Sequence, residues 1–339
     1  QPFNLVTPSG IISTTGVGGI TLGGGLGNMT RKYGLAIDNL LEADVVLADG
    51  SFTTAAPDLN PELFWALRGG GGNFGVVTSF LFKLHKLDSL VAGPMLWPID
   101  RAEELLKWYR DFIPRQSDDL NGFFAFLAIP PADPFPAELQ GKTMAGVVWT
   151  WTGSAEKAES TFAPIRAMFG GAALDWVGPI TNEGLNSMFD PFFPSGLQWY
   201  WKADFFNELS DKAVAEHVKF GSNLPTMLST MHLYPIDGAA GRVAKDATPW
   251  GYRDAKWGEV IAGIGDNPAD NPKMIAWAKA YWEALHPHSA GGAYINMMME
   301  EGDDRVKASY GPNYARLSAA KQRYDPHNLF RVNQNIKPA

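Results

Sequence analysis

The sequence of 339 residues contains no cysteine. Disulfide bonds, thiolate metal sites and cysteine nucleophiles are therefore excluded for these residues. The absence of cysteine does not decide in which cellular compartment the protein works. No apolar run approaches the roughly 18 residues of a membrane span, and no charged-then-apolar leader precedes Gln1. We expect a soluble protein with no membrane partner, and among the compartments the cytoplasm is favoured.

Basic residues are also scarce. The chain has 28 Lys and Arg against 36 Asp and Glu, which gives a formal net charge of −8, and it has no basic run. This balance argues against a nucleic-acid partner. Hydrophobic residues make up 45% and charged residues 19% of the chain, as in ordinary globular proteins. The length suffices for a large core and predicts two lobes.

Several catalytic and nucleotide-binding motifs are missing. The sequence has neither a Gly-x-Ser-x-Gly elbow nor a His-Glu-x-x-His motif, and its six histidines lack the usual spacing of metal ligands. A dinucleotide fingerprint beginning at Gly16 would need glycine where Thr21 stands. No Gly-Lys-Ser/Thr follows, which excludes a P-loop. We therefore expect no metal site and no Rossmann or Walker site.

Glycine is present in excess near the start of the chain. Seven of the twelve residues from 16 to 27 are glycine, and residues 67–78 form a second glycine-rich run. Such runs serve backbone conformations with positive φ, or the close approach of a flat or anionic ligand to backbone N–H groups. The alternative is tight turns and strand packing in a crowded sheet.

Further segments match a known family in order. The matching segments are residues 16–27, 31–35, 38–40, 45–50, 58–75, 310–317 and 324–330. Together they resemble the berberine-bridge-enzyme-like branch of the FAD-linked oxidases, which have a PCMH-type FAD-binding domain. The two ends of the chain match independently, whereas the middle matches only loosely.

This resemblance implies an α+β fold with two lobes, a partial FAD-binding lobe and a substrate lobe with an antiparallel sheet flanked by helices. Residues 1–90 would form the later half of the FAD-binding domain, 91–290 the substrate domain, and 291–339 a C-terminal segment that returns to the FAD lobe. The family carries an earlier FAD-binding segment, including a histidine that commonly bonds to the flavin, which this sequence lacks. We therefore expect either a fragment or a chain whose missing part is supplied elsewhere, and whether this chain alone retains FAD is open.

Hydrophobic periodicity and turn residues predict the individual elements. A hairpin with a two-residue Asp49-Gly50 turn is expected over 43–54, and a half-buried strand over 76–84. Helices are expected at 61–67, 102–112, 271–285 and after Pro312. In the middle lobe, strands are expected at 123–129, 144–152, 197–206, 228–236 and 259–264. Long antiparallel strands with segregated helices indicate an α+β fold, in which helices cover one face of the sheet.

Two tryptophan pairs stand at alternate positions of expected strands. Trp149 shares a strand face with Trp151, and Trp199 shares one with Trp201, so two aromatic walls could meet across a sheet. They would then form a substrate platform that covers the flavin, with Tyr252 as a further substrate contact. The alternative is core packing.

The resemblance also implies residues that bind FAD. In the first glycine run these are Thr15, Gly16, Gly18, Gly19, Gly23, Gly24, Gly25 and Gly27. In the second run they are Gly72, Asn73, Gly75, Val76 and Val77. Asn333 and Asn335 offer amides suited to the polar edge of a flavin, or else lie in a solvated terminal loop. Ile11–Thr15 covers the position of the family's linking cysteine, so a cysteinyl bond is impossible.

The implied reaction is oxidation of a small organic molecule, an alcohol, a sugar or a secondary metabolite. Hydride passes to FAD, O2 reoxidises the flavin, and a base accepts a proton. The family often uses tyrosine as this base, and the matching residues are Tyr294 and, second, Tyr310, with Tyr200 and Tyr252 as further candidates. Each could instead be a buried, hydrogen-bonded tyrosine. The alternative function is a truncated, catalytically silent module that binds a small molecule or sugar.

Overall fold

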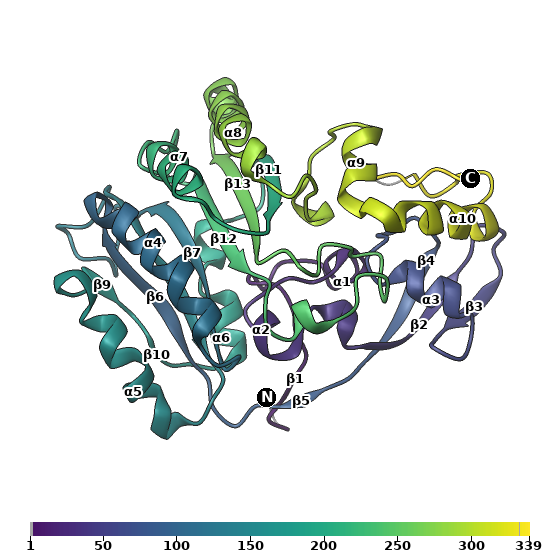
Figure 1. Cartoon of the computed structure of the whole chain (residues 1–339), viewed down its shortest axis with the longest axis horizontal. Coiled ribbons are helices and arrows are strands. Elements are labelled where there is room, and N and C mark those ends of the chain that lie inside the picture. The colour runs from purple at the N-terminus through teal and green to yellow at the C-terminus, as the bar shows by residue number, and fades with distance from the viewer. Residues whose placement is uncertain (1–2, 332) are drawn as a thin grey trace.

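A computed structural model describes residues 3–331 and 333–339 of the chain. Its strands form two lobes that lie side by side (Figure 1). The strands are β1 (Leu5–Val6), β2 (Leu40–Val46), β3 (Phe52–Ala55), β4 (Val76–Phe82), β5 (His85–Lys86), β6 (Val91–Pro98), β7 (Leu120–Ala128), β8 (Thr143–Trp151), β9 (Leu174–Asp175), β10 (Gly178–Pro179), β11 (Gln198–Phe206), β12 (Thr230–Pro235) and β13 (Trp257–Gly265). The helices are α1 (Val17–Gly23), α2 (Thr30–Tyr33), α3 (Pro61–Leu67), α4 (Ala102–Phe112), α5 (Ala155–Arg166), α6 (Asn182–Ser187), α7 (Asp211–Gly221), α8 (Asn271–Leu285), α9 (Asp303–Tyr310) and α10 (Tyr314–Tyr324). Among the described residues, no helix has both the length and the apolar character that crossing a membrane requires.

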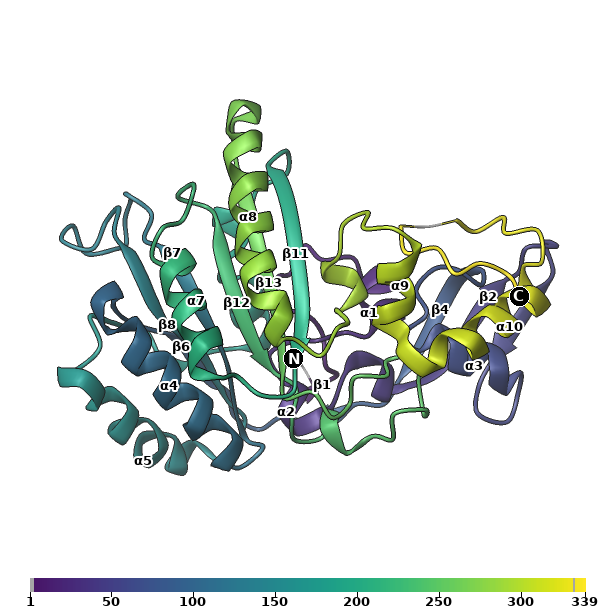
Figure 2. The same cartoon turned by 45° about the horizontal axis from the view of Figure 1, so that its top comes forward.

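The larger lobe is built on an eight-stranded antiparallel sheet. Its strands run in the order β10-β6-β8-β7-β12-β13-β11, and β9 pairs with β6. Helices α4, α5, α7 and α8 cover one face of this sheet (Figure 2). The opposite face packs against the smaller lobe, because Phe123, Val148, Phe205 and Val260 share a core with Leu63 and other residues of that lobe. The predicted α+β class with one helix-covered face is confirmed.

The smaller lobe combines both ends of the chain. Strands β3, β2 and β4 form an antiparallel sheet, and α3 packs near α10 of the tail. The Asn73 amide donates to the Gln334 carbonyl at 3.1 Å and accepts the Ile336 N–H at 3.1 Å. The last residues are thereby fixed beside the second glycine run.

Two buried arginines join the lobes. The Arg31 guanidinium, 1% exposed, contacts Asp237 at 2.7 Å and donates to the Ser117 carbonyl at 3.0 Å. Arg253 donates to both carboxylate oxygens of Asp38, at 2.8 and 2.7 Å. Bidentate arginine contacts fix orientation as well as distance, so the cavity between the lobes has fixed walls.

The predicted elements are confirmed, with differences at their edges. The strands expected in the middle lobe are β7, β8, β11, β12 and β13. The hairpin of β2 and β3 forms, but Val46 pairs with Phe52, so five residues rather than two connect the strands. The sequence analysis missed β6, because Gly93 and Pro94 weaken a strand signal and seven of its eight residues are buried without alternation.

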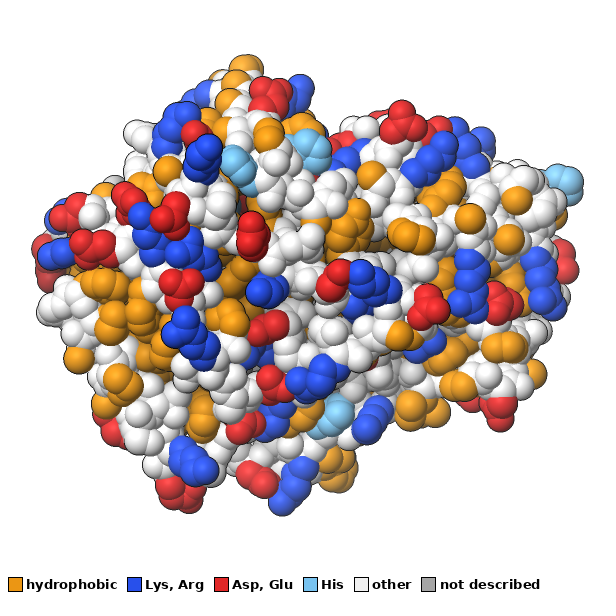
Figure 3. Space-filling model, viewed as in Figure 1, with side chains coloured by type: hydrophobic (Ala, Val, Ile, Leu, Met, Phe, Trp, Pro, Cys, Tyr) orange, Lys and Arg blue, Asp and Glu red, His pale blue; other side chains and the backbone are white. Residues whose placement is uncertain are grey.

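Acidic and basic side chains are interspersed over the face seen in Figure 3. One lysine, in contrast, is fully buried. The Lys321 ammonium donates to the Asn73 carbonyl at 2.7 Å, the Phe330 carbonyl at 2.8 Å and the Asp325 carboxylate at 2.6 Å. Both Lys321 and Asp325 have side chains with 0% exposure. This contact therefore holds α10 to the second glycine run without help from solvent.

Replacing Lys321 with Met should lower the free energy of unfolding by about 3–5 kcal/mol, because it leaves a buried carboxylate and two carbonyls unpaired. Lys337→Met is the matched control, since its ion pair with Asp303 is about half exposed on both sides and such pairs contribute little. Urea denaturation of both variants measures the effect. Equal stability of the two variants would contradict the structural role of Lys321.

Candidate functional site

A cavity of about 450 Å³ lies between the two lobes. We call it the interlobe cavity. One wall is formed by residues between Gly10 and Ile20, and the facing wall by the strands β11, β12 and β13. The returning tail closes it with residues 294–298 and with Asn333 and Gln334. Segments from the start, middle and end of the sequence therefore meet at one site.

The first half of the glycine run borders open space. Gly16 and Gly19 line the interlobe cavity, and a Cβ added at Gly16, Gly18 or Gly19 would meet no atom within 4 Å. Thr15 lies in the same wall and is exposed. Packing within the protein does not explain why glycine stands at these positions. They leave a backbone surface that a flat ligand could approach closely.

The second half of the run is packed against protein. A Cβ at Gly23 would lie 2.1 Å from Asn296, one at Gly24 2.5 Å from Trp250, one at Gly25 2.2 Å from Ala36, and one at Gly27 1.8 Å from the Ser9 carbonyl. Gly24 and Gly25 also have positive φ, at 141° and 85°. These four glycines were expected to contact FAD. Tight packing accounts for them, as the alternative interpretation held.

The second glycine run lies away from the interlobe cavity. Gly72, Asn73, Gly75, Val76 and Val77 are absent from its lining. The amide of Asn73 is used by the tail, and a Cβ at Gly75 would lie 2.5 Å from Val45. Val76 and Val77 pair with β2. The cofactor contacts expected in this run therefore lie outside the interlobe cavity and stay a prediction, while Asn73 anchors the tail and Gly75 is tightly packed.

Tyr294 lies on the interlobe cavity, as the base predicted from the sequence should. Its hydroxyl oxygen accepts the Gly25 N–H at 2.9 Å and the Asn296 amide at 2.8 Å. Its ring packs on Trp250 with centroids 4.7 Å apart. Burial raises the pKa of Tyr294, while the hydrogen bonds from Gly25 and Asn296 act in the opposite direction. The phenol is therefore protonated at neutral pH in this environment.

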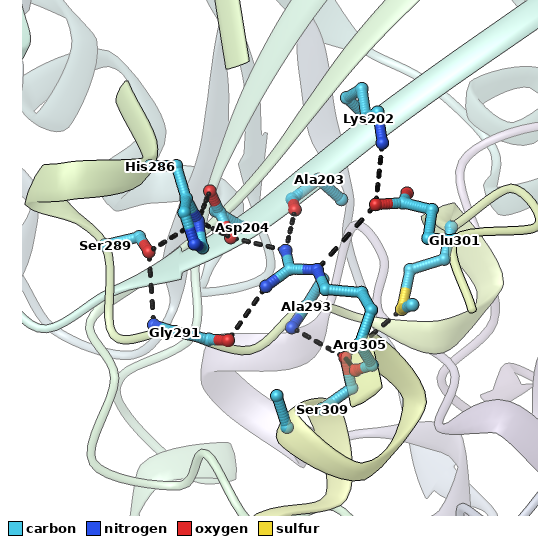
Figure 4. A network of polar contacts seen from close by, with 12 residues as sticks. Lys202, Ala203, Asp204, His286, Ser289, Gly291, Ala293, Glu301, Arg305 and Ser309 are labelled. Atoms are coloured by element: carbon cyan, nitrogen blue, oxygen red, sulfur yellow. Dashed lines mark hydrogen bonds and ion pairs between the residues drawn. The ribbon is translucent and has the colours of Figure 1, made fainter. Parts of the chain in front are cut away.

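A buried network holds the segment that carries Tyr294 (Figure 4). Arg305 donates to the Gly291 carbonyl at 2.8 Å, the Ala203 carbonyl at 2.7 Å and the Asp204 carboxylate at 2.5 Å. His286 lies 3.0 Å from the other carboxylate oxygen of Asp204. Burial raises the pKa of Asp204, against the lowering effect of Arg305 and His286. This network ties residues on both sides of Tyr294 to strand β11.

The other predicted tyrosines do not line the interlobe cavity. Tyr310 is 2% exposed, and its hydroxyl has no hydrogen-bond partner within the described residues. Tyr252 donates to the Ala308 carbonyl at 2.7 Å and stacks on Phe205. Tyr200 packs with the helix-covered core. The structure therefore supports the alternative of buried or packed tyrosines for these three, and not the predicted contacts with substrate.

The two tryptophan pairs lie on opposite faces of the large sheet. Trp199 and Trp201 line the interlobe cavity, with ring centroids 5.5 Å apart. Trp149 and Trp151 belong instead to the core beneath the helices, where Trp149 packs against Tyr109 of α4 and is 0% exposed. The expected single platform of both pairs is wrong, because the two strands turn their tryptophans to different sides.

The terminal amides lie near the same cavity. Asn333 lines it, whereas Asn335 does not. The Asn335 side-chain oxygen is nevertheless buried without a hydrogen-bond partner among the described residues. A buried acceptor without a partner costs free energy, so this atom fits a site that a ligand completes.

Sequence analysis missed a His–Tyr pair on β12. His232 and Tyr234 share the cavity face, and the His232 Nδ1 atom lies 2.8 Å from the Tyr234 hydroxyl. Their rings pack against Phe123. Burial lowers the pKa of His232 to about 4 and raises that of Tyr234. The period-two spacing of a strand was the only signal that could have paired them.

Comparison with known proteins identifies the family. The family described as "Berberine and berberine like" matches residues 293–337, and "FAD binding domain" matches residues 1–56. The FAD-linked oxidoreductase fogF of Aspergillus ruber is 30% identical over 97% of this chain and 68% of its own length. The chain belongs to the berberine-bridge-enzyme-like family of FAD-linked oxidoreductases. The predicted family is thus confirmed.

Other members of the family agree. The (R)-6-hydroxynicotine oxidase of Paenarthrobacter nicotinovorans is 28% identical over 99% of this chain and 73% of its own length. A crystal structure of 6-hydroxy-D-nicotine oxidase from Arthrobacter nicotinovorans has a TM-score of 0.83 at 26% identity and covers 100% of this chain and 75% of that chain. The protein is an FAD-dependent oxidoreductase, and the alternative of a silent binding module is not favoured.

The interlobe cavity of this berberine-bridge-like chain fits FAD. Gly16 and Gly19 leave open backbone in its lining, with no protein atom within 4 Å of an added Cβ, so a flat ring could approach them closely. Asn333 adds an amide to the lining of the same cavity, which a polar edge of a ligand could contact.

Gly19→Val tests this fit. A Cβ at this position meets no protein atom within 4 Å, so thermal unfolding of the FAD-free protein should change little, whereas FAD affinity should fall at least about tenfold, or 1.4 kcal/mol. Gly178→Val is the control, because a Cβ there also meets nothing and the position is outside the interlobe cavity. Titration with FAD followed by flavin fluorescence measures both. Unchanged affinity in Gly19→Val would remove this segment from the cofactor site.

Proposed function

We propose that the interlobe cavity is where FAD and a small organic substrate meet. One observation carries this proposal: the open glycine wall faces a strand surface on which His232, Tyr234, Trp199 and Trp201 converge. Relatives named xylooligosaccharide oxidase and (R)-6-hydroxynicotine oxidase act on small molecules. We infer a small-molecule substrate for this chain as well, with O2 as the final electron acceptor.

In this proposal Thr15, Gly16, Gly18 and Gly19 hold the cofactor from one side, and Asn333 and Asn335 hold its polar edge. When bound, FAD supplies two-electron oxidation, taking a hydride from the substrate and passing both electrons to O2, which leaves as H2O2. The sequence offers no cysteine for a covalent bond, so we propose that these residues bind FAD noncovalently.

We further propose a division of the chain into functional parts. Residues 1–90 and 291–339 form the FAD lobe, and residues 91–290 form the substrate lobe. Two observations support these boundaries. The large sheet begins with β6 at Val91, and the tail contacts Asn73 of the smaller lobe twice: Lys321 donates to its carbonyl, and its side-chain amide donates to the Gln334 carbonyl.

Two groups in the cavity could accept the substrate proton. Tyr294 is the residue expected from the sequence, and two N–H donors on its oxygen favour the phenolate. It must first lose its own proton, however, which burial opposes. His232 is neutral at pH 7 because burial lowers its pKa to about 4. A neutral imidazole accepts a proton without prior ionisation, and His232 lies in the cavity lining with Tyr234 on its Nδ1 atom, so we propose His232 as the acceptor.

Tyr234 orients His232 in this scheme. If the Nδ1–H of His232 donates to the Tyr234 hydroxyl at 2.8 Å, the Nε2 lone pair is the acceptor left for the substrate. Tyr294 then acts as a positioning group, which joins the Gly25 backbone to Asn296. In this scheme the substrate hydroxyl would lie between the side chains of His232 and Tyr294.

The pH dependence of kcat/KM separates the two acceptors. With His232 as acceptor, activity requires neutral imidazole, so it stays level from pH 9 to about pH 5 and falls only as the pH approaches the lowered pKa, about 4. With Tyr294 as acceptor, activity instead rises with pH toward the raised pKa of its phenol.

His232→Asn should lower kcat about 100-fold or more, the usual contribution of a proton acceptor, without loss of bound FAD. Tyr294→Phe should lower kcat less and leave the pH profile unchanged. A profile that rises with pH in the unmodified protein and is abolished in Tyr294→Phe would assign the acceptor to Tyr294 instead.

Acid precipitation of the FAD-loaded protein tests the mode of attachment. Noncovalent FAD should leave with the supernatant, because denaturation removes every contact that holds it. An absorbance scan from about 300 to 550 nm of both fractions measures this. Flavin bands that remain in the pellet would contradict noncovalent binding.

A further inference from the structure

A second cavity, of about 400 Å³, opens beside the interlobe cavity. We call it the apolar chamber. The two cavities share Ile11, Ile12, Phe193, Thr230 and His232 in their linings. A molecule that occupies the chamber can therefore contact His232. Its volume is in the range of small-molecule sites.

The lining of the chamber is almost entirely hydrocarbon. Its floor is the cavity-facing side of β6, β7 and β8, with Leu96, Leu127 and Val148. Trp176, stacked on Phe135 with centroids 4.9 Å apart, forms one side. Phe189 and neighbouring phenylalanines form another.

The few polar side chains of the lining are already occupied or lie at its border. The Thr230 hydroxyl donates to the Phe126 carbonyl at 2.7 Å, and the Ser229 hydroxyl accepts the Ile264 N–H at 3.1 Å. Asp133 is exposed, and His232 faces both cavities. A sugar would leave several hydroxyls without partners here, which is costly in a buried site.

We propose that the apolar chamber binds the hydrocarbon body of the substrate, an aryl or prenyl group, and presents one hydroxyl to His232. The substrate class is thus an apolar primary or secondary alcohol rather than an oligosaccharide. The occupant follows from continuity with the interlobe cavity and from a lining that offers dispersion contacts and hardly any free hydrogen-bonding groups. This inference rests on the proposed function of the interlobe cavity.

Calorimetric titration of the FAD-loaded protein with geraniol, a prenyl alcohol, tests the proposal, with cellobiose as the comparison. Geraniol should bind and cellobiose should not. Leu127→Asp should weaken geraniol binding at least tenfold, because it sets a carboxylate into the chamber, with FAD content unchanged. Leu81→Asp is the control, since Leu81 is 54% exposed on β4 and outside the chamber. Trp176→Ala is a second variant, 39% exposed in the native protein and therefore tolerant of truncation.

The outcomes separate this inference from the function on which it rests. If Leu127→Asp or Trp176→Ala weakens geraniol binding, the result supports the apolar chamber as the binding site of the hydrocarbon group, whether or not geraniol reduces the flavin. Binding without anaerobic bleaching of the flavin band would count against the proposed function alone. Binding that neither variant weakens, or oxidation of cellobiose in preference to geraniol, would overturn the proposed substrate class.

Discussion

The buried contact between Arg305 and Asp204 is the constraint on which the site depends. Strand β11 is the edge of the large sheet, and an unpaired edge leaves carbonyls without partners. Arg305 satisfies the Ala203 carbonyl and the Asp204 carboxylate together, while also holding Gly291. Together with the backbone hydrogen bonds between Phe205 and residues 290 and 292, this side chain joins the segment that carries Tyr294 to the substrate lobe. Loss of Arg305 would leave the buried Asp204 carboxylate with His286 as its remaining charged partner, which is unfavourable for a buried charge.

The glycine run illustrates how far the sequence could be interpreted. Its density indicated either ligand approach or tight packing, and the structure divides the run: some glycines are tightly packed, and the others border open space where ligand contact stays a prediction. Gly16, Gly18 and Gly19 border open space, whereas Gly23 would strike Asn296, which lies 273 residues away in the sequence. That separation is why no local pattern could distinguish the two groups. The family resemblance located the run correctly but gave every glycine the same role.

The strands of the large sheet were predictable because long runs with alternating hydrophobicity and aromatic residues are typical of β-strands and rarely form other secondary structure. The side to which each run turns its tryptophans was not predictable. Trp149 and Trp201 each belong to a Trp-x-Trp pair on a strand. Trp149 nevertheless packs under α4, whereas Trp201 faces the interlobe cavity. Strand order and register decide this. His232 escaped notice for the same reason, since a single histidine carries no signal until Tyr234 and Phe123 surround it.

The central claim is that FAD binds between the 15–19 segment and the returning tail. Hydrogen exchange with and without FAD, read by mass spectrometry, tests this claim most directly, because ligand contact slows exchange of the backbone amides it covers. The account predicts slower exchange at residues 15–25, 293–298 and 333–336, with no change at 72–77, which lie outside the lining of the interlobe cavity. Protection at 72–77 without protection at 15–25 would contradict it.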